Sequence, residues 1–228
     1  MAIEREKILD AAFSLLDEAG LDRFTTRRLA ERLGVQQPAL YWHFASKAAL
    51  LDALNHEMLL RFHSRRVPRP DERWDEFTLA YARGFRRALL AVRDGARINT
   101  GARPTDADFA DYERQLELYV AAGFTAHEAL AIALSVTRYV VGYVLEEQNE
   151  RERAETEPDA VGDPLQEVAA FPLLAEAMRP LMRGTDIDTE AVFERGLAYL
   201  LTGIRLTLAA KAKPASGNGS KAKRRSAR

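Results

Sequence analysis

Cysteine is absent from the 228 residues of this sequence, which excludes disulfide bonds, thiolate metal sites and cysteine catalysis. Such a composition fits the reducing cytoplasm, where we expect the protein to act. No apolar run approaches the roughly 18 residues that a membrane helix needs. The N-terminal segment, MAIEREKILDAAFSLLDEAG, alternates charged and apolar residues at helical spacing and lacks the form of a signal peptide. We therefore expect no membrane partner.

Motifs of catalysis are also missing. The four histidines stand at positions 43, 56, 63 and 127, without an HExxH motif, a GxSxG motif or a glycine-rich phosphate loop. His56-Glu57 is an isolated pair on a predicted helix, which is typical of a solvated surface. The sequence therefore argues against an enzyme.

Signals for β-structure are few, because β-branched runs and Asn-Gly or Asp-Gly turns are scarce. Hydrophobic residues make up 47% of the chain, enough for a sizeable core. We predict an all-α fold with a three-helix N-terminal head over residues 1–47 and a larger helical body over residues 48–210.

The net charge of −1 hides an uneven distribution. Residues 1–47 hold seven basic and seven acidic residues, whereas residues 48–210 hold 19 basic and 27 acidic ones. The body is therefore acidic. A local basic face matters more than the total for attraction to phosphates. Five of the seven basic residues of the head fall within residues 23–47: Arg23, Arg27, Arg28, Arg32 and Lys47.

The last segment, KAKPASGNGSKAKRRSAR at 211–228, holds seven basic residues and no acidic ones. Its low complexity and lack of large apolar residues predict a disordered tail. Two interpretations stay open, a non-specific attraction to nucleic acid and a solubilising terminus without further role.

The segment FTTRRLAERLGVQQPALYWHFASK, residues 24–47, has the spacing of two short helices joined by a tight turn. Thr25 or Thr26 can cap the first helix, and Gly34 can end it in a left-handed conformation. The second helix is predicted to begin around Gln37-Pro38, because proline is favoured at a first-turn position. This pattern is a helix-turn-helix, a fold element that enters the major groove of DNA.

The second of these helices carries a Tyr-Trp-His run. Val35 and Leu40 can anchor the turn and helix to the core, which leaves Tyr41, Trp42 and His43 facing outward or sideways. Exposed aromatic side chains with polar tips indicate a partner, and a nucleic-acid groove suits them. The alternative is an ordinary amphipathic helix with Tyr41, Trp42 and Phe44 in the core.

The whole stretch resembles the DNA-binding head of the tetracycline-repressor (TetR) family, through TTRRLAERLG, QPALYWHF and a lysine at position 47. The resemblance implies that seven residues contact operator DNA: Arg27, Gln37, Pro38, Tyr41, Trp42, His43 and Lys47. Ala39 departs from the threonine usual in that family, so its base preference is open.

Side-chain chemistry assigns roles to these positions. Arg27 can pair with both acceptors of guanine, and Gln37 can do the same with adenine. The Pro38 ring and the Ala39 methyl group can contact the thymine methyl group. The remaining polar residues are expected to hold phosphates: Thr26, Tyr41, His43 and Lys47.

Helical periodicity divides the rest of the chain. A first helix should end at Gly20, and a long helix capped by Ser46 should run to about Arg65. The body is predicted to hold helices near 71–93, 105–122, 125–153, 164–182 and 188–210, with a turn-rich piece around 95–103.

The segments 125–153 and 188–210 have apolar surfaces wider than one stripe, so each should bury against more than one neighbour. We expect the second neighbour to be another subunit. The alternative is that both helices lie inside a monomer's core. The resemblance implies that this pair forms a four-helix dimer interface, which presents two heads to a roughly palindromic operator.

The resemblance extends through most of residues 3–150 and implies a pocket for a small-molecule effector. Family pocket positions are retained at His63, Phe85, Arg103, Pro104, Gln115 and Glu146. Four positions depart: Tyr81 replaces an asparagine, Ala102 a threonine, Arg138 a histidine and Asn99 the histidine that binds the metal ion. Arg138 beside Arg103 favours a ligand with an anionic group. The alternative is that Arg138 forms a surface or interface salt bridge.

Magnesium-bound tetracycline is the ligand that the resemblance implies, and Asn99 counts against the family's usual way of binding it. A neutral amide oxygen is less selective than imidazole for a divalent cation. We expect no other cofactor or metal. The function predicted is a homodimeric repressor that a small-molecule inducer releases from its operator, at an efflux or resistance gene. The alternative is a DNA-binding regulator without an effector, its pocket filled by Tyr81 and Arg138.

Overall fold

The structure, a computed structural model, describes residues 3–156, 163–183 and 186–212. Within these ranges all regular secondary structure is helical apart from two paired two-residue strands, β1 (Met182–Arg183) and β2 (Asp186–Ile187). The predicted all-α fold is thereby confirmed. Most of the predicted basic tail, from residue 213 onward, lies outside the described residues.

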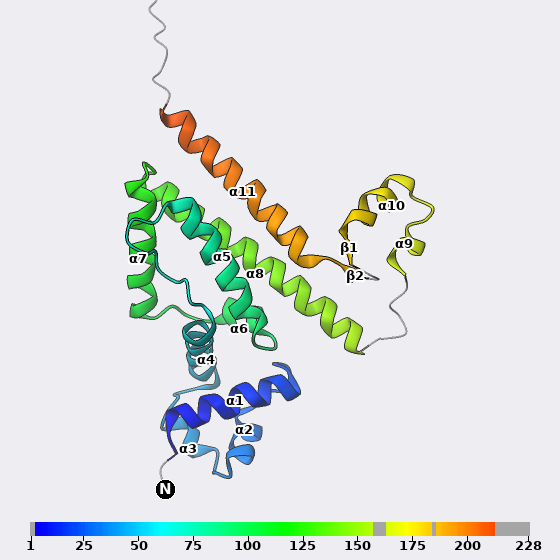
Figure 1. Cartoon of the computed structure of the whole chain (residues 1–228). Helices are drawn as coiled ribbons and strands as arrows, with labels where there is room; N and C mark the ends of the chain where they lie inside the picture. The colour runs from blue at the N-terminus through cyan, green and yellow to red at the C-terminus, as the bar shows by residue number, and fades with distance from the viewer. Residues whose placement is uncertain (1–2, 157–162, 184–185, 213–228) are drawn as a thin grey trace, which may run out of the picture.

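Three helices form the head at one end of the molecule (Figure 1): α1 (Arg5–Ala19), α2 (Thr26–Leu33) and α3 (Pro38–Tyr41). Thr25 rather than Thr26 caps α2, since its Oγ accepts a hydrogen bond from the Arg28 backbone N–H at 3.2 Å. Gly34 ends the helix in the left-handed region at φ 66°. The predicted positions of Gly20 and Pro38 at helix ends are confirmed.

Helix α4 (Lys47–Phe62) joins the head to the body. Ser46 caps it as predicted, accepting a hydrogen bond from the Ala49 N–H at 3.1 Å. The helix ends three residues before the predicted Arg65, because His63 leaves helical geometry at φ −102° and ψ 83°. One apolar cluster runs from the head through Leu54 and Met58 of α4 into the body. The head is therefore packed onto the body rather than tethered to it.

The body contains α5 (Trp74–Leu90), α6 (Gly95–Gly101), α7 (Asp106–Ala121), α8 (Ala126–Thr156) and α11 (Thr189–Ala212). The prediction of a turn-rich piece around 95–103 was wrong, because α6 occupies most of it. Asp94, at φ 60°, reverses the chain just before α6. Gly95 lies so close to α5 that an added Cβ would meet the Leu89 carbonyl oxygen at 2.2 Å, which only glycine tolerates.

The single helix predicted over 164–182 is also wrong. The chain forms α9 (Pro164–Glu167), α10 (Pro172–Met178) and a 3-10 turn (Arg179–Leu181) before β1. Pro172 starts α10 and cannot continue a preceding helix, since proline lacks an N–H and clashes with the previous turn. Three short pieces therefore replace one long helix.

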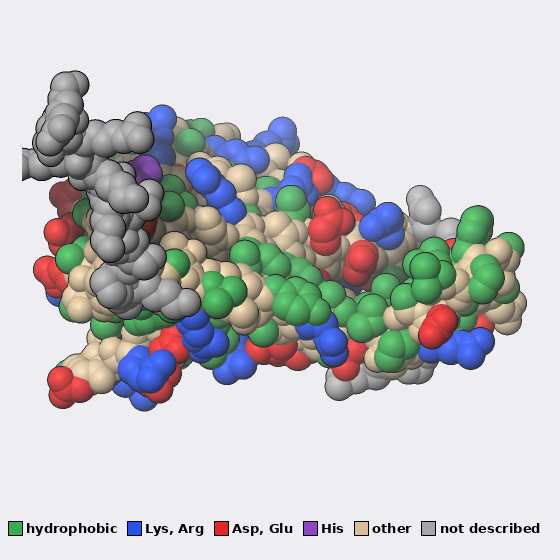
Figure 2. Space-filling model, turned by 90° about the horizontal axis from the view of Figure 1, so that it is seen from above, with side chains coloured by type: hydrophobic (Ala, Val, Ile, Leu, Met, Phe, Trp, Pro, Cys, Tyr) green, Lys and Arg blue, Asp and Glu red, His purple; other side chains and the backbone are tan. Residues whose placement is uncertain are grey.

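Helices α8 and α11 pack on each other and leave apolar side chains uncovered in the single chain. On α11, Tyr199 is 69% exposed and Leu206 is 66% exposed. The alternative that both helices lie wholly inside a monomer's core is therefore wrong. Figure 2 shows hydrophobic side chains along the middle of one face and over the lobe of α9 and α10.

By length and composition, α8 could cross a membrane. One face of this helix is instead committed to the protein core, because Ala129, Val136, Val140 and Val144 are buried against the other helices of the body.

Candidate DNA-binding surface and ligand pocket

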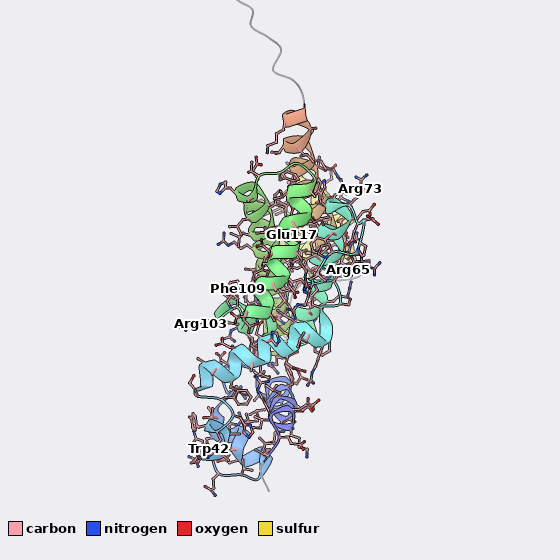
Figure 3. All side chains as sticks on the ribbon, turned by 90° about the vertical axis from the view of Figure 1, so that its left-hand side faces the viewer. Trp42, Arg65, Arg73, Arg103, Phe109 and Glu117 are labelled. Carbon is pink, nitrogen blue, oxygen red and sulfur yellow. The ribbon has the colours of Figure 1, made fainter. Side chains whose placement is uncertain are left out.

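The aromatic residues after the turn of the helix-turn-helix divide between surface and core. Trp42 is 89% exposed and Tyr41 is 47% exposed, whereas Phe44 is buried. Figure 3 shows Trp42 at the end of the head, away from the body. The alternative that all three residues belong to the core holds for Phe44 only. A large indole exposed on this scale is the feature expected of a binding surface.

A polar network links the two helices of the motif. The Gln37 side-chain amide donates to the Thr26 hydroxyl at 2.8 Å and reaches the Tyr41 hydroxyl at 3.4 Å. Arg27 is largely exposed, and its Nε donates to Glu31 at 2.9 Å. This contact leaves the outer nitrogens of the Arg27 guanidinium facing solvent, where they can meet a base edge.

Lys47 begins α4 and closes the motif. Its ammonium donates to the Phe24 carbonyl oxygen at 2.8 Å and lies 5.7 Å from the Phe24 ring centroid. An ammonium has three donors, so this bond leaves others for a phosphate. The nine residues predicted to contact DNA lie on α2, on α3 and its flanks, and at the start of α4: Thr26, Arg27, Gln37, Pro38, Ala39, Tyr41, Trp42, His43 and Lys47.

A cavity of about 270 Å³ opens among α4, α5, α7 and α8 in the body. Six of the ten predicted ligand residues line it: His63, Tyr81, Phe85, Asn99, Pro104 and Gln115. The sequence prediction missed ten further lining residues: Leu59, Arg66, Asp108, Asp111, Tyr112, Leu116, Leu130, Ala133, Leu134 and Thr137.

Four predicted ligand residues do not line this cavity: Ala102, Arg103, Arg138 and Glu146. Helix α8 turns Leu130, Ala133, Leu134 and Thr137 toward it, at the spacing of one helical face. Arg138 is the next residue along and therefore points about 100° away, and it is exposed. Arg103 projects from the outer edge of the body (Figure 3). In the single chain, the predicted pair of arginines does not reach the pocket.

His63 is an uncharged wall of the pocket. It is only 4% exposed, its ring stacks on Phe85 at 5.5 Å between centroids, and it meets the edge of Tyr81 at 4.7 Å. Burial lowers the pKa of His63 to about 4. The imidazole is therefore neutral at pH 7, and its buried Nε2 has no hydrogen-bond partner among the described residues.

The polar end of the pocket is an ion cluster. One terminal nitrogen of Arg66 lies 2.8 Å from a carboxylate oxygen of Asp108 and 2.8 Å from one of Asp111. The Gln115 amide donates to the Arg66 carbonyl oxygen at 2.7 Å. The sequence signal that could have located this cluster is the capping box that begins α7, Thr105 with Asp108, followed one turn later by Asp111.

The pocket side chains do not form a site for a divalent cation. The Asn99 side-chain amide donates to the Asn55 oxygen at 2.9 Å. Among the residues that the structure describes, no group of three histidine, aspartate or glutamate side chains is placed to hold a metal ion. The ligand set of this pocket therefore disagrees with a magnesium site built by protein side chains.

Helix α6 contacts both the pocket and the head. Asn99 lines the pocket, while Arg97 pairs with Asp22 of the head at 2.6 Å and with Asp94 at 2.9 Å. Asp94 also accepts the Leu21 backbone N–H at 2.7 Å. A shift of α6 caused by a ligand would therefore act directly on the head.

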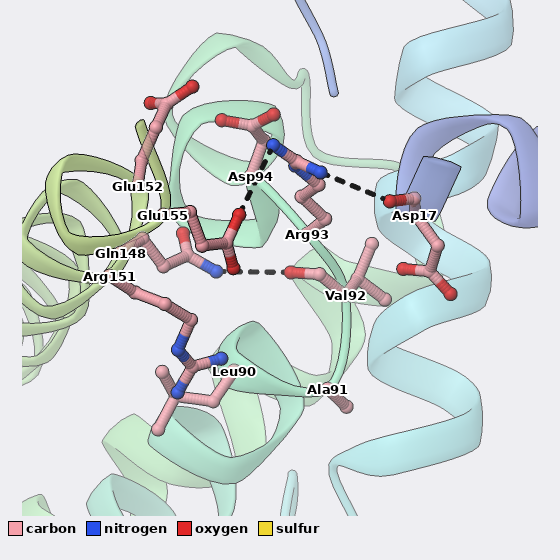
Figure 4. A pocket seen from close by; sticks show the side chains of 10 residues that line it. All are labelled: Asp17, Leu90, Ala91, Val92, Arg93, Asp94, Gln148, Arg151, Glu152 and Glu155. Atoms are coloured by element: carbon pink, nitrogen blue, oxygen red, sulfur yellow. Dashed lines mark hydrogen bonds and ion pairs between the residues drawn. The ribbon is translucent and has the colours of Figure 1, made fainter. Parts of the chain in front are cut away.

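A second cavity, also of about 270 Å³, lies beside this junction (Figure 4). Arg93 crosses it, donating to the Asp17 carbonyl oxygen at 3.3 Å and lying 3.8 Å from Glu155 of α8. Gln148 of α8 donates to the Val92 carbonyl oxygen at 3.0 Å. The end of α8 thus supports the loop between α5 and α6 on which the head rests.

An exposed helix-turn-helix in the head and a largely apolar pocket in the body define a DNA-binding regulator with a candidate ligand-binding body. Residues 8–54 match the bacterial regulatory proteins of the tetR family, and residues 67–208 match the tetracyclin repressor-like C-terminal domain. The chain belongs to the TetR family. It is accordingly a transcriptional repressor that binds operator DNA as a homodimer.

Among its relatives, the chain is 42% identical over 202 residues to the tetracycline repressor protein class A from transposon 1721 of Escherichia coli, which covers 89% of this chain and 90% of that protein. It is 47% identical over 159 residues to the class G repressor of Vibrio anguillarum, covering 69% and 76%. These relatives are transcriptional repressors.

Solved structures agree in fold. TetR class A in complex with 5a,6-anhydrotetracycline and magnesium gives a TM-score of 0.70 at 38% identity, covering 90% of this chain and 99% of that one. A single-residue variant of TetR from Acinetobacter baumannii AYE, in complex with minocycline, gives 0.72 at 39% identity, covering 90% and 98%.

Proposed function

We propose that this protein represses an efflux or resistance gene in the cytoplasm, without enzymatic activity, and releases the operator when a drug-sized effector enters the pocket among α4, α5, α7 and α8. The proposal rests on one observation. A single apolar cluster and helix α6 connect the pocket wall to the head. Occupancy of the pocket can therefore change the position of the DNA-binding surface.

We propose that each of the three segments predicted from the sequence has its own function. Residues 1–47 bind DNA, residues 48–210 bind the effector and dimerise, and residues 211–228 add a basic tail. On the head, Arg27 and Gln37 would contact base edges, with Pro38 and Ala39 beside thymine. The other predicted contacts would hold the backbone: Thr26, Tyr41, Trp42, His43 and Lys47.

Two helices would carry the signal. Helix α4 begins beside the head and carries Leu59 of the pocket, and His63 follows directly after its last residue. Helix α6 carries Asn99. Binding that moves either helix changes the spacing of the two heads in the dimer, so they no longer fit successive major grooves. A thousandfold release requires about 4 kcal/mol of differential binding, which a buried drug-sized ligand can supply.

A regulator without an effector is the competing function, and the packing of Tyr81 favours it. This side chain contacts Phe77, His63 and Phe85 and occupies part of the pocket wall. Arg138 does not share that role, because it lies outside the pocket. A ligand that stabilises the protein against heat would support the effector-responsive function, whereas a broad screen with no stabilising compound would favour the competing one.

The decisive experiment is a titration of the homodimer into a duplex selected from random DNA, monitored by fluorescence anisotropy. The titration is repeated with 5a,6-anhydrotetracycline, with and without magnesium. Release of the operator by the drug identifies a tetracycline-type inducer. Whether that release requires magnesium tests if the pocket still binds the metal complex with Asn99 in place of histidine. Tight palindromic binding that ignores the drug keeps the repressor and discards tetracyclines as its signal. Failure to select any duplex would refute the proposal.

A further inference from the structure

The ion cluster at the polar end of the pocket carries an excess negative charge. Arg66 supplies one positive charge, whereas Asp108 and Asp111 supply two negative ones. Burial would raise the pKa of Asp108, but hydrogen bonds from the Thr105 backbone and hydroxyl, together with the charge of Arg66, lower it below the ordinary value. Asp108 is therefore ionised at neutral pH.

The other titratable groups that line the pocket do not cancel this charge. Burial keeps His63 neutral and raises the pKa of both Tyr81 and Tyr112. At the rim, Arg114 lies 3.5 Å from Asp111, but its side chain is largely exposed and screened by water. His56 stands 3.7 Å from Asp108 outside the lining. Arg66 is the single arginine or lysine among the lining residues, and it is already shared by two carboxylates.

Much of the remaining lining of the same cavity is apolar. Its walls come from four helices and include Leu59, Phe85, Leu116, Leu130 and Leu134. A ligand that fills the cavity therefore places an apolar body against these side chains and one polar end near Asp108 and Asp111. An anionic group would enter an environment that is already negative, whereas a cationic group would gain a charge-assisted hydrogen bond.

From this arrangement we infer that the effector is an apolar molecule bearing a protonated amine, which Asp111 and Asp108 bind without a divalent metal ion. The inference rests on the proposed function, because it names the ligand class of the same pocket. It also replaces the sequence expectation of an anionic ligand held by Arg103 and Arg138, since neither arginine lines the cavity.

Three probes with one ring system test the charge preference: 9-aminoacridine, a cation at pH 7, acridone, which is neutral, and acridine-9-carboxylate, an anion. Binding to the purified homodimer is measured by calorimetry in the absence of DNA, with EDTA present. We expect the cation to bind at least about tenfold more tightly than the anion, with the neutral compound between them. Equal affinities, a preference for the anion, or no binding of any probe would overturn the inference.

Two isosteric variants on α7 locate the preference. Asp111→Asn removes one negative charge from the pocket, while Glu113→Gln removes the same charge from an exposed position of the same helix that does not line the cavity. We expect Asp111→Asn to weaken 9-aminoacridine about tenfold and leave acridone unchanged. Equal losses in both variants would show long-range attraction rather than a pocket contact, and would count against the inference.

Operator binding separates this inference from the proposed function. A protein that binds its operator and releases it with anhydrotetracycline, yet shows no charge preference among the acridines, keeps the repressor function and refutes the cationic ligand class. A protein that binds 9-aminoacridine through Asp111 without any change in operator affinity keeps the ligand class and refutes effector-controlled repression.

Discussion

The head and the pocket place their functional side chains in opposite environments. Trp42 of the head is 89% exposed, whereas His63 of the pocket is 4% exposed. The Trp42 and Arg27 side chains of the head are exposed to solvent, while the pocket wall is also part of the core of the body. Substitutions in the head should therefore change DNA binding with little effect on stability, and substitutions in the pocket should change both.

The largest effect is expected in helix α4, because its buried side chains belong to the apolar cluster shared by the head and the body. Met58 is completely buried, so we expect Met58→Ala to lower the free energy of unfolding by about 2–5 kcal/mol. The matched control is Leu60→Ala on the same helix, where the side chain is 56% exposed and the expected loss is under about 0.5 kcal/mol. Chemical denaturation at one protein concentration measures both.

The same denaturation also reports on cooperativity. Since the apolar cluster is continuous from head to body, Met58→Ala should weaken the whole chain in one transition. Two separated transitions, with the head melting first, would show that the head folds independently of the body.

Acid sensitivity should distinguish the pocket from the head. The pKa of His63 is lowered to about 4 in the folded protein, so the unfolded chain binds a proton at higher pH, near 6.5. Stability is then complete above about pH 6.5 and falls as the pH decreases toward 4, by about 2 kcal/mol at pH 5. Thermal melts at pH 7 and pH 5 measure this loss.

A His63→Asn variant should reduce the difference between the two melts, because asparagine does not titrate. His43→Asn in the head is the matched control, since it removes a histidine that is not buried in the pocket wall. If the two variants gave the same pH dependence as the original protein, the acid sensitivity would have to originate outside the pocket.

Arg27→Ala tests whether a substitution in the head changes operator binding without changing stability. The guanidinium is exposed and contacts only Glu31 within its own helix, so thermal stability should change little. We expect the variant to lose about 1–3 kcal/mol of operator affinity and to relax specificity at one base pair per half-site. Anisotropy titrations on operators substituted at each position test this. A uniform loss on every sequence would indicate a phosphate contact instead.

The smallest effect on stability is expected at the junction of the two regions. Asp22→Asn removes the partner of Arg97 between head and α6, whereas Glu194→Gln removes the partner of Arg83 in an exposed pair of the same 2.6 Å length within the body. Both melting temperatures should change little. The concentration of inducer that releases the operator should shift for Asp22→Asn and stay constant for Glu194→Gln. Identical shifts would remove α6 from the signalling route.

Local sequence determined most of the head. A threonine cap, a glycine in the left-handed region and a proline at the first turn act within a few residues of themselves, so they set the ends of α2 and α3 without help from the body. The wide apolar surfaces of α8 and α11 were likewise visible as patterns. Six pocket residues followed from the family resemblance rather than from such local rules.

Three features depended on tertiary structure and could not be read from the sequence pattern: helix α6, the ion cluster of the pocket and the orientation of α8. Helix α6 forms where turn signals predominate, and its first residue, Gly95, packs against the Leu89 backbone of α5. The cluster of Arg66, Asp108 and Asp111 joins the chain after α4 to the start of α7. The orientation of α8 about its axis turns Arg138 away from the pocket. Periodicity fixes which side chains share a face of one helix, but only the packing of several helices fixes which faces meet. The charge of the pocket is therefore a property of the fold.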